Sequence, residues 1–540
     1  MSLTPPITLN NLSFAWPSGE RALANLDGTF PSGRTGLIGA NGSGKSTLLK
    51  LIAGQLHPTS GTAETSAPLS YLPQTLALEQ DATVAQLLGV HRVLAALEAI
   101  ESGSVDPADF DAVGANWDAE ARVRAELAPL GFDGLDLGRK VATLSGGEAM
   151  LLAVIGLRIA DSPITLLDEP TNNLDRPTRE LLYDLVRAWK GTLVVVSHDI
   201  ELLELMEHTV ELYGGKLSVF GGPYSAYREQ LETEQQAAEQ AARTAQASLK
   251  VEKRQRAEAE TKLARAKRKG RAKRKGRATQ LSGGMPKILA NHLRQKSEAN
   301  AGKMRSNLDG KVDSAQARLD DADQRVRQAE HINIELPDPR LPSGKQVAAL
   351  GAEDHQFIIQ GAERVSLVGP NGSGKTRLLQ QMLSGEAPGP GPGGTLFVDR
   401  VGYLPQRLDG LDGELSAMQN VASVAPEATA NDVRKMLARL LLRGDSADRP
   451  LAVLSGGERF RVYLATLLLA EPTAQLLILD EPTNNLDMDS VRQLSEALGA
   501  YKGALLVVSH DQHFLAQLDL DYLLEVGPRG TLAKTYPNPV

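Results

Sequence analysis

The chain has 540 residues, and this length predicts about three or four domains. With 42% hydrophobic and 23% charged residues, the composition is typical of a globular protein. Cysteine is absent, which excludes disulfides, thiolate zinc sites, iron–sulfur clusters and cysteine nucleophiles. The sequence has no apolar run of membrane-spanning length and no secretory signal, so we expect a cytoplasmic protein. The net charge of −8, taken over the whole chain, argues against a nucleic-acid partner.

The first chemical motif is a glycine-rich loop, GANGSGKST, at 39–47. It follows a strand predicted over 36–38 and precedes a helix predicted over 48–52, which is the setting that a GxxxxGK[ST] phosphate-binding loop requires. Backbone N–H groups of such a loop surround phosphates, while Lys45 neutralises their charge and Ser46 is expected to bind Mg²⁺. The predicted nucleotide contacts are Gly39, Ala40, Asn41, Gly42, Ser43, Gly44, Lys45, Ser46 and Thr47.

Further along the chain, two adjacent carboxylates end a strand predicted over 164–167. Asp168 is expected to hold Mg²⁺, and Glu169 to act as the general base that polarises the attacking water. His198 follows another Val-rich strand, from which its side chain can reach the same phosphate. These residues predict a site that hydrolyses a nucleoside triphosphate.

The chain is duplicated, since five sequence blocks recur in the same order. The loop recurs as GPNGSGKTR at 369–377, and the spacing from aspartate to histidine is 30 residues in both copies. The second copy therefore predicts a second site, with Asp480 for Mg²⁺ and with Glu481 and His510 for catalysis. Its predicted nucleotide contacts are Gly369, Pro370, Asn371, Gly372, Ser373, Gly374, Lys375, Thr376 and Arg377, of which Thr376 is also expected to bind Mg²⁺.

The two copies differ in length at one place. From Gln74 to Ser145 is 71 positions, whereas from Gln406 to Ser455 is 49, so the first copy carries 22 extra residues. We place this insertion at about 90–117, as a short arm. The alternative is a surface loop without a role.

Between the copies lies a segment, 228–332, that matches neither. Its composition and its heptad-like apolar spacing predict two helices with a coiled-coil seam, joined by a Gly-rich turn into an antiparallel hairpin. A helix of forty residues is about 60 Å long. The expected seam residues are Leu231, Ala238, Ala242, Ala245 and Leu249 in the first helix and Leu308, Val312, Ala315, Leu319, Ala322, Val326 and Ala329 in the second. The sequence LSGG at 281–284 is interpreted as turn glycine.

Positive charge is concentrated at the tip of this hairpin, 262–305, with 15 Lys and Arg against one acid. Such a cluster suits phosphate backbones, and no aromatic residue lies in 228–332, so we expect contact with RNA that is independent of base stacking. The alternative is a disordered solubilising or targeting patch. The predicted RNA contacts are Lys267, Arg268, Lys269, Arg271, Lys273, Arg274, Lys275, Arg277 and Lys287.

Together these blocks resemble the ATP-binding cassette superfamily across nearly the whole chain outside the hairpin. The resemblance implies that Gln74 and Gln406 contact Mg²⁺ and the attacking water, and that Trp16 stacks on adenine, where the second copy has Leu341. It also implies that the cassettes face head to tail, so that the LSGGE signature of each completes the ATP site of the other. The implied signature contacts are Ser145, Gly147, Ser455 and Gly457.

Within the superfamily, two cassettes joined by a helical hairpin resemble the F subfamily. This resemblance implies an α/β fold with two tandem P-loop ATPase domains, 1–227 and 333–540, joined by the hairpin linker, and a monomer whose domains close on each other. It implies binding to the ribosomal E site, with the linker toward P-site tRNA and the peptidyl-transferase centre, and the long tip resembles members that protect ribosomes from antibiotics. The alternatives are a translation factor without drug resistance and, less favoured, the ATPase subunit of a membrane transporter.

The signature helices of the two copies differ. After the second LSGGE comes Arg459-Phe-Arg461, the pattern usual in the superfamily, whereas after the first comes Ala149-Met-Leu151. The ATP site that uses Ser145 is therefore expected to differ in rate from the other.

Overall fold

A computed structural model of the chain describes residues 7–65, 67–76, 81–172, 174–278, 287–325, 336, 338–352, 355–386, 393–406, 410–440, 442, 444–454, 456–484, 486–527 and 531–536. The chain forms two compact units, one of 226–330 and the other of 1–225 together with 331–540. The two units are described in turn.

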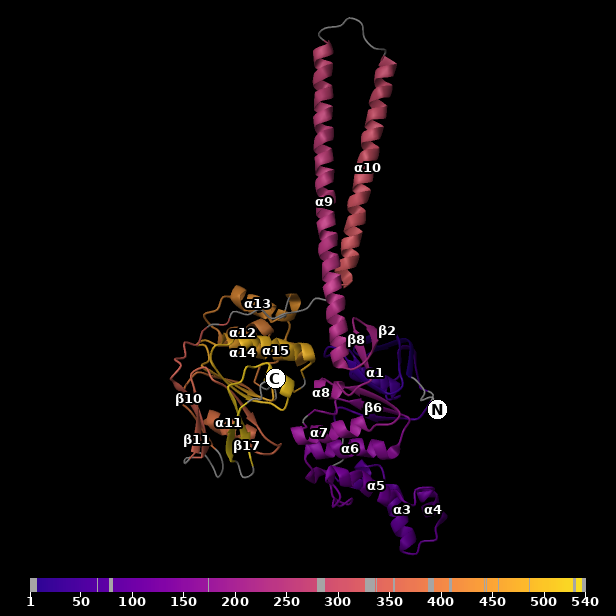
Figure 1. Cartoon of the computed structure of the whole chain (residues 1–540), viewed down its shortest axis with the longest axis vertical. Coiled ribbons are helices and arrows are strands. Elements are labelled where there is room, and N and C mark those ends of the chain that lie inside the picture. Colours follow the sequence, from indigo (N-terminus) through magenta and orange to yellow (C-terminus); the bar gives the residue numbers. More distant parts are fainter. Residues whose placement is uncertain are drawn as a thin grey trace. The chain divides into compact units, whose positions relative to one another are not determined.

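The first half of the larger unit is built on a six-stranded sheet (Figure 1). Its strand order is β5 (Leu69–Leu72), β6 (Ile164–Asp168), β7 (Thr192–Val196), β3 (Arg34–Ile38), β8 (His208–Tyr213) and β9 (Lys216–Gly221). All neighbours are parallel except β8 and β9. Strands β6 and β7 are completely buried, which explains why they are continuous apolar runs and do not alternate.

The second half repeats this sheet strand for strand. Its order is β14 (Val401–Leu404), β15 (Leu476–Asp480), β16 (Ala504–Val508), β12 (Arg364–Val368), β17 (Tyr522–Val526) and β18 (Leu532–Thr535). Each half adds a three-stranded antiparallel sheet, β2 (Arg21–Phe30), β1 (Ile7–Ala15) and β4 (Ser60–Thr65) in the first and β11 (His355–Gln360), β10 (Gln346–Ala352) and β13 (Gly393–Leu396) in the second. The duplication predicted from sequence is therefore confirmed, together with the α/β fold class.

Helices connect the strands of both halves. In the first half they are α1 (Lys45–Ile52), α2 (Val84–Leu87), α3 (His91–Glu101), α4 (Pro107–Val113), α5 (Ala119–Leu127), α6 (Gly146–Ala160), α7 (Arg176–Arg187) and α8 (Ile200–Leu203). In the second half they are α11 (Lys375–Ser384), α12 (Ala417–Val424), α13 (Ala430–Arg439), α14 (Gly456–Leu469), α15 (Met488–Ala500) and α16 (Gln512–Ala516). Several of these helices, such as α1, α6 and α14, pack on the parallel sheets. Leu48 of α1 packs in one core with Leu166 of β6 and Val194 of β7, so this helix and the three-stranded sheet cover the same face. None of the described helices is long and apolar enough to cross a membrane.

The strand order places the chemical motifs at one edge. Strand β7 pairs in parallel with both β6 and β3, with Asp168 level with Val196 and Val196 level with Leu37. The phosphate loop after β3, the carboxylates at the end of β6 and the histidine after β7 therefore start from neighbouring strand ends. Ligands bind at such carboxyl ends in parallel sheets.

The segment predicted as an arm, 90–117, contains α3 and α4, which pack on each other. The rings of Phe110 and Trp117 lie 6.1 Å apart between centroids, and both side chains are exposed. The segment therefore has secondary structure of its own. Its assignment as an insertion with a role stays a prediction.

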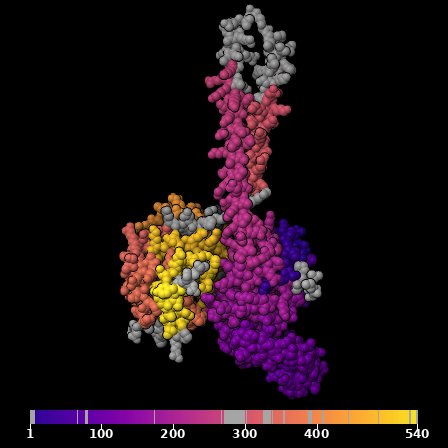
Figure 2. All heavy atoms as spheres, in the orientation of Figure 1, coloured from indigo at the N-terminus to yellow at the C-terminus, as the bar shows by residue number. Residues whose placement is uncertain are grey.

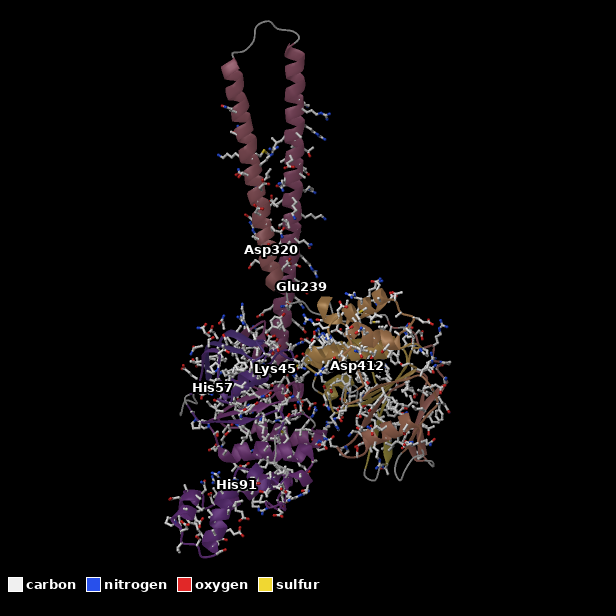
Figure 3. All side chains as sticks on the ribbon, turned by 180° about the vertical axis from the view of Figure 1, so that it is seen from behind. Lys45, His57, His91, Glu239, Asp320 and Asp412 are labelled. Carbon is white, nitrogen blue, oxygen red and sulfur yellow. The ribbon has the colours of Figure 1, made fainter. Side chains whose placement is uncertain are left out.

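The smaller unit is a hairpin of two long helices, α9 (Tyr224–Ala278) and α10 (Lys287–Arg325) (Figures 1 and 2). A salt bridge of 2.8 Å joins Arg256 of α9 to Asp309 of α10, and Figure 3 shows Glu239 and Asp320 toward the same end of the hairpin, so the two helices are antiparallel. Helix α9 continues through both RAKRKG repeats, because Ala, Lys and Arg are strong helix formers, so the repeats lie on a helix and not in the turn.

The helices pack through the predicted seam. The predicted seam residues Leu249, Ala315 and Ala322 are buried, as is Ala259, which was not predicted, while most of the neighbouring charged side chains are exposed. The expected turn glycines at 281–284, the seam residues Val326 and Ala329, and the domain boundary at 332 lie outside the described residues. The limits 1–227, 228–332 and 333–540 therefore stay predictions.

The seam predicts that a charge inside it loosens the hairpin. An Ala315→Asp change puts an unpaired carboxylate between the helices, at a cost of about 1–3 kcal/mol. We expect trypsin to cut the linker about tenfold faster, because cleavage follows the population of the opened state. The matched control is Ala317→Asp, the same change at an exposed position of α10, and equal cleavage of the two variants would contradict the seam.

Candidate active sites

The first phosphate loop joins β3 to α1 and needs its glycines for two reasons. Gly42 and Gly44 have φ angles of 78° and 98°, which other residues rarely adopt, and a Cβ on Gly39 would lie 2.5 Å from the carbonyl oxygen of Leu212. Lys45 Nζ donates to the carbonyl oxygens of Gly39 and Ala40, at 2.7 and 3.1 Å. The ammonium group is therefore held inside the loop, beside the N-terminus of α1, where phosphate oxygens bind.

The second phosphate loop has the same geometry. Lys375 Nζ donates to the carbonyl oxygens of Gly369 and Pro370, at 2.8 and 2.9 Å. Burial lowers the pKa of Lys375, and likewise that of Lys45, while the neighbouring carboxylates oppose the shift. Buried ammonium groups of this kind are stabilised by anionic partners, so both loops are suited to polyphosphate.

The aspartates that end β6 and β15 are almost completely buried. Asp168 accepts hydrogen bonds from the Ser46 hydroxyl, at 3.1 Å, and from the Tyr71 hydroxyl, at 3.3 Å. No hydrogen bond within 3.5 Å reaches the carboxylate of Asp480 from the described residues, although the Thr376 hydroxyl lies near enough to lower its pKa somewhat. Burial raises the pKa of both aspartates, and a nearby cation would offset that burial cost.

These residues fit Mg²⁺. Hydroxyl and carboxylate oxygens are the hard donors that Mg²⁺ prefers, and this ion is commonly held by one or two protein groups together with phosphates and water. In keeping with this, the described part of the chain has no cluster of three or more His, Cys, Asp or Glu side chains that could hold a metal alone. Ser46 with Asp168, and Thr376 with Asp480, are the groups that would hold the ion.

The predicted general bases have an unusual backbone and a raised pKa. Glu169 and Glu481 follow their strands with φ angles of 51° and 48°, and Glu169 N donates to the carbonyl oxygen of Val196 at 2.9 Å. Burial raises the pKa of Glu169 to about 8 and that of Glu481 to about 7, although the nearest lysine opposes each shift. Once ionised, a carboxylate with a raised pKa is a stronger base than an exposed one, and cations bound in the site favour that ionised form.

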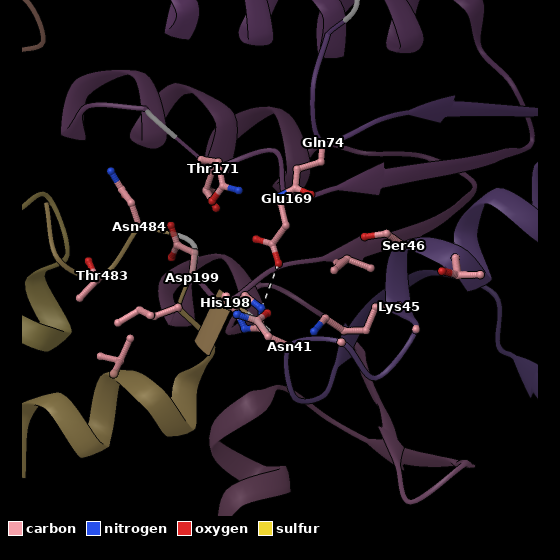
Figure 4. Close-up of a pocket in the computed structure, with 18 of the residues that line it drawn as sticks. Asn41, Lys45, Ser46, Gln74, Glu169, Thr171, His198, Asp199, Thr483 and Asn484 are labelled. Atoms are coloured by element: carbon pink, nitrogen blue, oxygen red, sulfur yellow. Dashed lines mark ion pairs between the residues drawn. The ribbon is translucent and has the colours of Figure 1, made fainter. Parts of the chain in front are cut away.

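Each glutamate has a histidine partner. Glu169 Oε1 lies 3.2 Å from His198 Nε2, the contact drawn as a dashed line in Figure 4, and Glu481 Oε1 lies 3.4 Å from His510 Nε2. Burial lowers the pKa of His198 to about 3 and that of His510 to about 4, and the adjacent lysines contribute. The imidazoles are therefore neutral at pH 7 and can orient the glutamate or a phosphate oxygen by hydrogen bonding.

The first group of predicted residues lines one cavity of about 680 Å³. Trp16, Gln74, Lys45, Glu169 and His198 all border it, together with most of the phosphate loop. Its far wall comes from the second half of the chain, including Gly456, Thr483 and Asn484, the last two of which Figure 4 shows opposite Glu169. Trp16 is 38% exposed and meets the ring of Phe14 in a T-shaped contact, so part of its surface is available to a ligand in the cavity.

The second group lines a cavity of about 610 Å³, which is bordered by Gln406, Lys375, Glu481 and His510. Thr376, Arg377 and Asp480 lie in the same wall, and residues of the first half contribute to the other. Leu341 is partly buried against the core of the second half, and no aromatic residue takes the place of Trp16 among the described residues of this wall. The two cavities therefore differ at the expected adenine position.

Hydrogen bonds join the halves reciprocally. The backbone N of Asn41 donates to Asp487 Oδ2 at 2.7 Å, and the backbone N of Asn371 donates to Asp175 Oδ2 at 3.0 Å. Hydrogen bonds from Thr178 and from Asn371 lower the pKa of Asp175, although burial opposes them, so this aspartate is ionised. Each phosphate loop is thus bound by a charged residue of the opposite half.

The signature residues are placed less evenly. Ser145 caps α6, where its hydroxyl accepts from Glu148 N at 3.2 Å, and Gly147 and Gly457 are buried at the helix starts. Gly456 borders the first cavity, whereas Ser145 is not among the described residues that border the second. Ser455 lies outside the described residues.

Sequence reasoning missed several site residues. Tyr71 binds Asp168, and its recurrence in the repeated YLPQ block was a signal that could have found it. Arg459, noted only as part of a usual pattern, borders the first cavity. Arg179 borders both cavities, and no sequence signal pointed to it because Val491 stands at the matching place of the other copy.

The predicted RNA contacts lie on the hairpin, apart from these sites in sequence. Arg268 and Lys269 are exposed on α9. The side chains of the remaining predicted contacts lie outside the described part: Lys267, Arg271, Lys273, Arg274, Lys275, Arg277 and Lys287.

The position of Trp16 predicts a spectroscopic signal. If adenine stacks on this ring, ATP quenches the tryptophan fluorescence of the protein, and Trp16→Leu, which copies Leu341, removes the quenching and weakens binding at this site by about three- to tenfold. Trp117→Leu, in the exposed segment 90–117, is the matched control and should keep both properties. Quenching that survives in Trp16→Leu would contradict the assignment.

Comparison with known proteins places this geometry in a family. The ABC transporter family model matches residues 23–172 and 352–484. The tylosin resistance ATP-binding protein TlrC of Streptomyces fradiae is 31% identical over 559 residues, covering 96% of this chain and 94% of that protein. The ABC transporter F family member 5 of Arabidopsis thaliana is 28% identical over 529 residues, covering 89% of this chain and 69% of that protein.

Among solved structures, the archaeal ribosome recycling factor in complex with the ribosomal stalk protein is similar, with a TM-score of 0.56. The superposition covers 97% of this chain and 89% of the recycling factor, at 19% sequence identity. This likeness shows the fold alone. Both phosphate loops, both carboxylate pairs and the full-length match to relatives agree in one assignment. The chain belongs to the F subfamily of the ATP-binding cassette proteins and contains two of their ATPase domains.

Proposed function

We propose that both sites bind ATP with Mg²⁺ and hydrolyse it to ADP and phosphate, each being completed by the opposite half of the chain. Two observations support sites that are shared between the halves. The backbone N–H groups of Asn41 and Asn371 donate to Asp487 and Asp175 of the opposite half. In addition, Gly456 and Asn484 of the second half line the first cavity. By the family resemblance, Ser455 and Ser145 complete the γ-phosphate contacts when the halves close.

The residues divide the chemistry between them. Lys45 and the loop N–H groups hold the β- and γ-phosphates, and Ser46 and Asp168 would hold Mg²⁺, which would supply further positive charge to the site. Glu169 accepts a proton from water as the water oxygen attacks the γ-phosphorus, and the bond to the bridging oxygen of ADP breaks. His198 Nε2 lies 3.2 Å from Glu169 Oε1 and the imidazole stays neutral, so it is placed to orient these groups without competing for the proton. Lys375, Thr376, Asp480, Glu481 and His510 repeat these roles.

We further propose that the partner is the ribosome, and that the chain protects it from antibiotics. The observation that carries this proposal is the hairpin tip 262–305, where 15 basic residues stand against one acid on two long helices. Such a surface binds RNA backbones in a salt-sensitive way, as rRNA and P-site tRNA near the E site would require. The name of the relative TlrC, a tylosin resistance protein, favours drug protection.

A translation factor that acts on stalled or idle ribosomes without drug resistance is the second candidate. It uses the same ATPase domains and the same basic hairpin, and the F family member of Arabidopsis thaliana has a name that gives no drug. The ATPase subunit of a transporter is less favoured, because docking on a membrane partner does not call for a basic hairpin of this length. In the two ribosomal alternatives the chain acts as a cytoplasmic monomer whose halves close on each other.

The ribosome proposal predicts a trapped complex. Glu169→Gln combined with Glu481→Gln removes both bases but keeps ATP binding, so the closed state persists, and the variant should sediment with ribosomes in the presence of ATP. The matched control adds Lys45→Ala and Lys375→Ala, which remove phosphate binding and should abolish co-sedimentation. Failure of the first variant to sediment with ribosomes would refute the partner.

Removing the positive charges of the hairpin tip tests whether they contact RNA. Replacing the Lys and Arg residues within 267–277 by Gln keeps the length of α9 and should leave basal ATPase activity unchanged, because the change lies far in sequence from both sites. Ribosome-stimulated ATPase activity should fall and lose much of its salt dependence. Bacteria that express the wild-type chain should tolerate higher concentrations of ribosome-targeting drugs than bacteria that express the Gln variant. An unchanged susceptibility in both strains, with stimulation intact in the wild type, would favour the translation factor.

A further inference from the structure

The two halves carry different residues in the first turn of α7 and α15, the helices that follow Asp175 and Asp487. Asp175 and Asp487 cap α7 and α15, and each binds the opposite phosphate loop. Four residues after these caps stand Arg179 in the first half and Val491 in the second. A cation and an aliphatic side chain therefore occupy matching places in otherwise similar interfaces.

Arg179 is held by two contacts within its own half. Its Nε donates to the carbonyl oxygen of Leu174 at 3.1 Å, and its Nη1 lies 3.5 Å from Asp199 Oδ2. The side chains of Arg179 and Asp199 are only 16% and 7% exposed, and the Tyr183 hydroxyl also donates to Asp199 Oδ2, at 2.7 Å. A charged pair this well buried and bonded is fixed in place, in contrast to a surface pair.

The same guanidinium faces the second half. It borders the second cavity together with Lys375, Glu481 and His510, and a smaller recess together with Asp511. Burial raises the pKa of Asp511, and the nearby charge of Asp199 adds to this shift, while the Phe514 N–H and Arg179 oppose it. Acids of both halves, Asp199 and Asp511, therefore lie near Arg179. Arg179 also borders the first cavity, where Val491 lies in the opposite wall.

A chain of contacts links Arg179 to the second phosphate loop. Leu174, whose carbonyl oxygen it binds, immediately precedes Asp175, and Asp175 binds the backbone N of Asn371. Val491 has no donor with which to hold the matching carbonyl oxygen of Leu486. The first half therefore has a fixation of its interface loop that the second half lacks at this position.

We propose that Arg179 is a positioning residue for the ATP site of the second half, and that it makes the two sites unequal. It fixes the loop that carries Asp175 against the phosphate loop of Lys375 and adds a positive charge to that cavity. This inference rests on the proposed binding of ATP at both sites.

The test isolates each site. In a Lys45→Ala chain only the second site binds nucleotide, and in a Lys375→Ala chain only the first. Adding Arg179→Met, which keeps volume but removes charge and donors, should weaken binding of a fluorescent non-hydrolysable ATP analogue with Mg²⁺ by about tenfold in the Lys45→Ala chain, as expected for a lost charged hydrogen bond. In the Lys375→Ala chain the affinity should change less than about twofold, because Arg179, although it borders the first cavity, is bonded to Leu174 and Asp199, whereas the first phosphate loop is bound by Asp487.

Controls separate positioning from folding. Arg179→Lys should restore most of the affinity because it keeps a positive donor, and Arg187→Met, the same change at an exposed position of α7, should have no effect. Equal weakening at both sites, or a loss that Lys does not restore, would overturn the inference. If neither single-site chain binds the analogue, the proposed ATP function fails, whereas binding that is normal at both sites with Arg179→Met refutes the role of Arg179 alone.

Discussion

Two adjacent carboxylates buried at the end of an apolar strand are the constraint on which each half depends. Asp168 and Glu169 follow four buried residues of β6, and a charge placed there is costly unless cations or donors surround it. The neighbouring strand ends supply them: Lys45 from the loop after β3, the Ser46 hydroxyl from α1, and His198 after β7. The negative charge of the carboxylates that these groups do not compensate is suited to a cation bound together with phosphate. The burial that makes the strand a stable core element thus also makes its end reactive.

The interface between the halves also depends on buried carboxylates, which here accept hydrogen bonds from backbone N–H groups. Asp487 reaches the first phosphate loop through the N–H of Asn41, and Asp175 reaches the second through that of Asn371. A carboxylate that accepts a backbone N–H is a charge-assisted bond, stronger than a neutral one. Each phosphate loop is therefore held partly by the opposite half. If the halves close on each other around ATP, as proposed above, that motion would act directly on these contacts.

Much of this arrangement could be predicted from the sequence because the motifs fix local backbone geometry. The glycine pattern of the loop, the apolar strands before Asp168 and Asp480, and the apolar spacing of α10 each allow one structure, and the duplication repeats the result. Features that depend on contacts distant in sequence were not predictable. Tyr71 meets Asp168 only because β5 lies beside β6, and Arg179 reaches the second cavity only because the halves meet there. The end of α9 was not predicted, although the basic repeats that it contains are good helix formers.

The crossed bonds between aspartates and phosphate loops have a consequence for how the two copies can diverge after duplication. The donors are backbone N–H groups, so the constraint falls on the path of each loop and on the acid of the other half, which lies 446 residues from Asn41 and 196 residues from Asn371. The copies can therefore drift apart where such bonds are absent, as at Arg179 and Val491, while the two acids and the paths of the loops that they bind must be kept. Exchanging one half for the corresponding half of a relative would accordingly disturb both nucleotide sites at once.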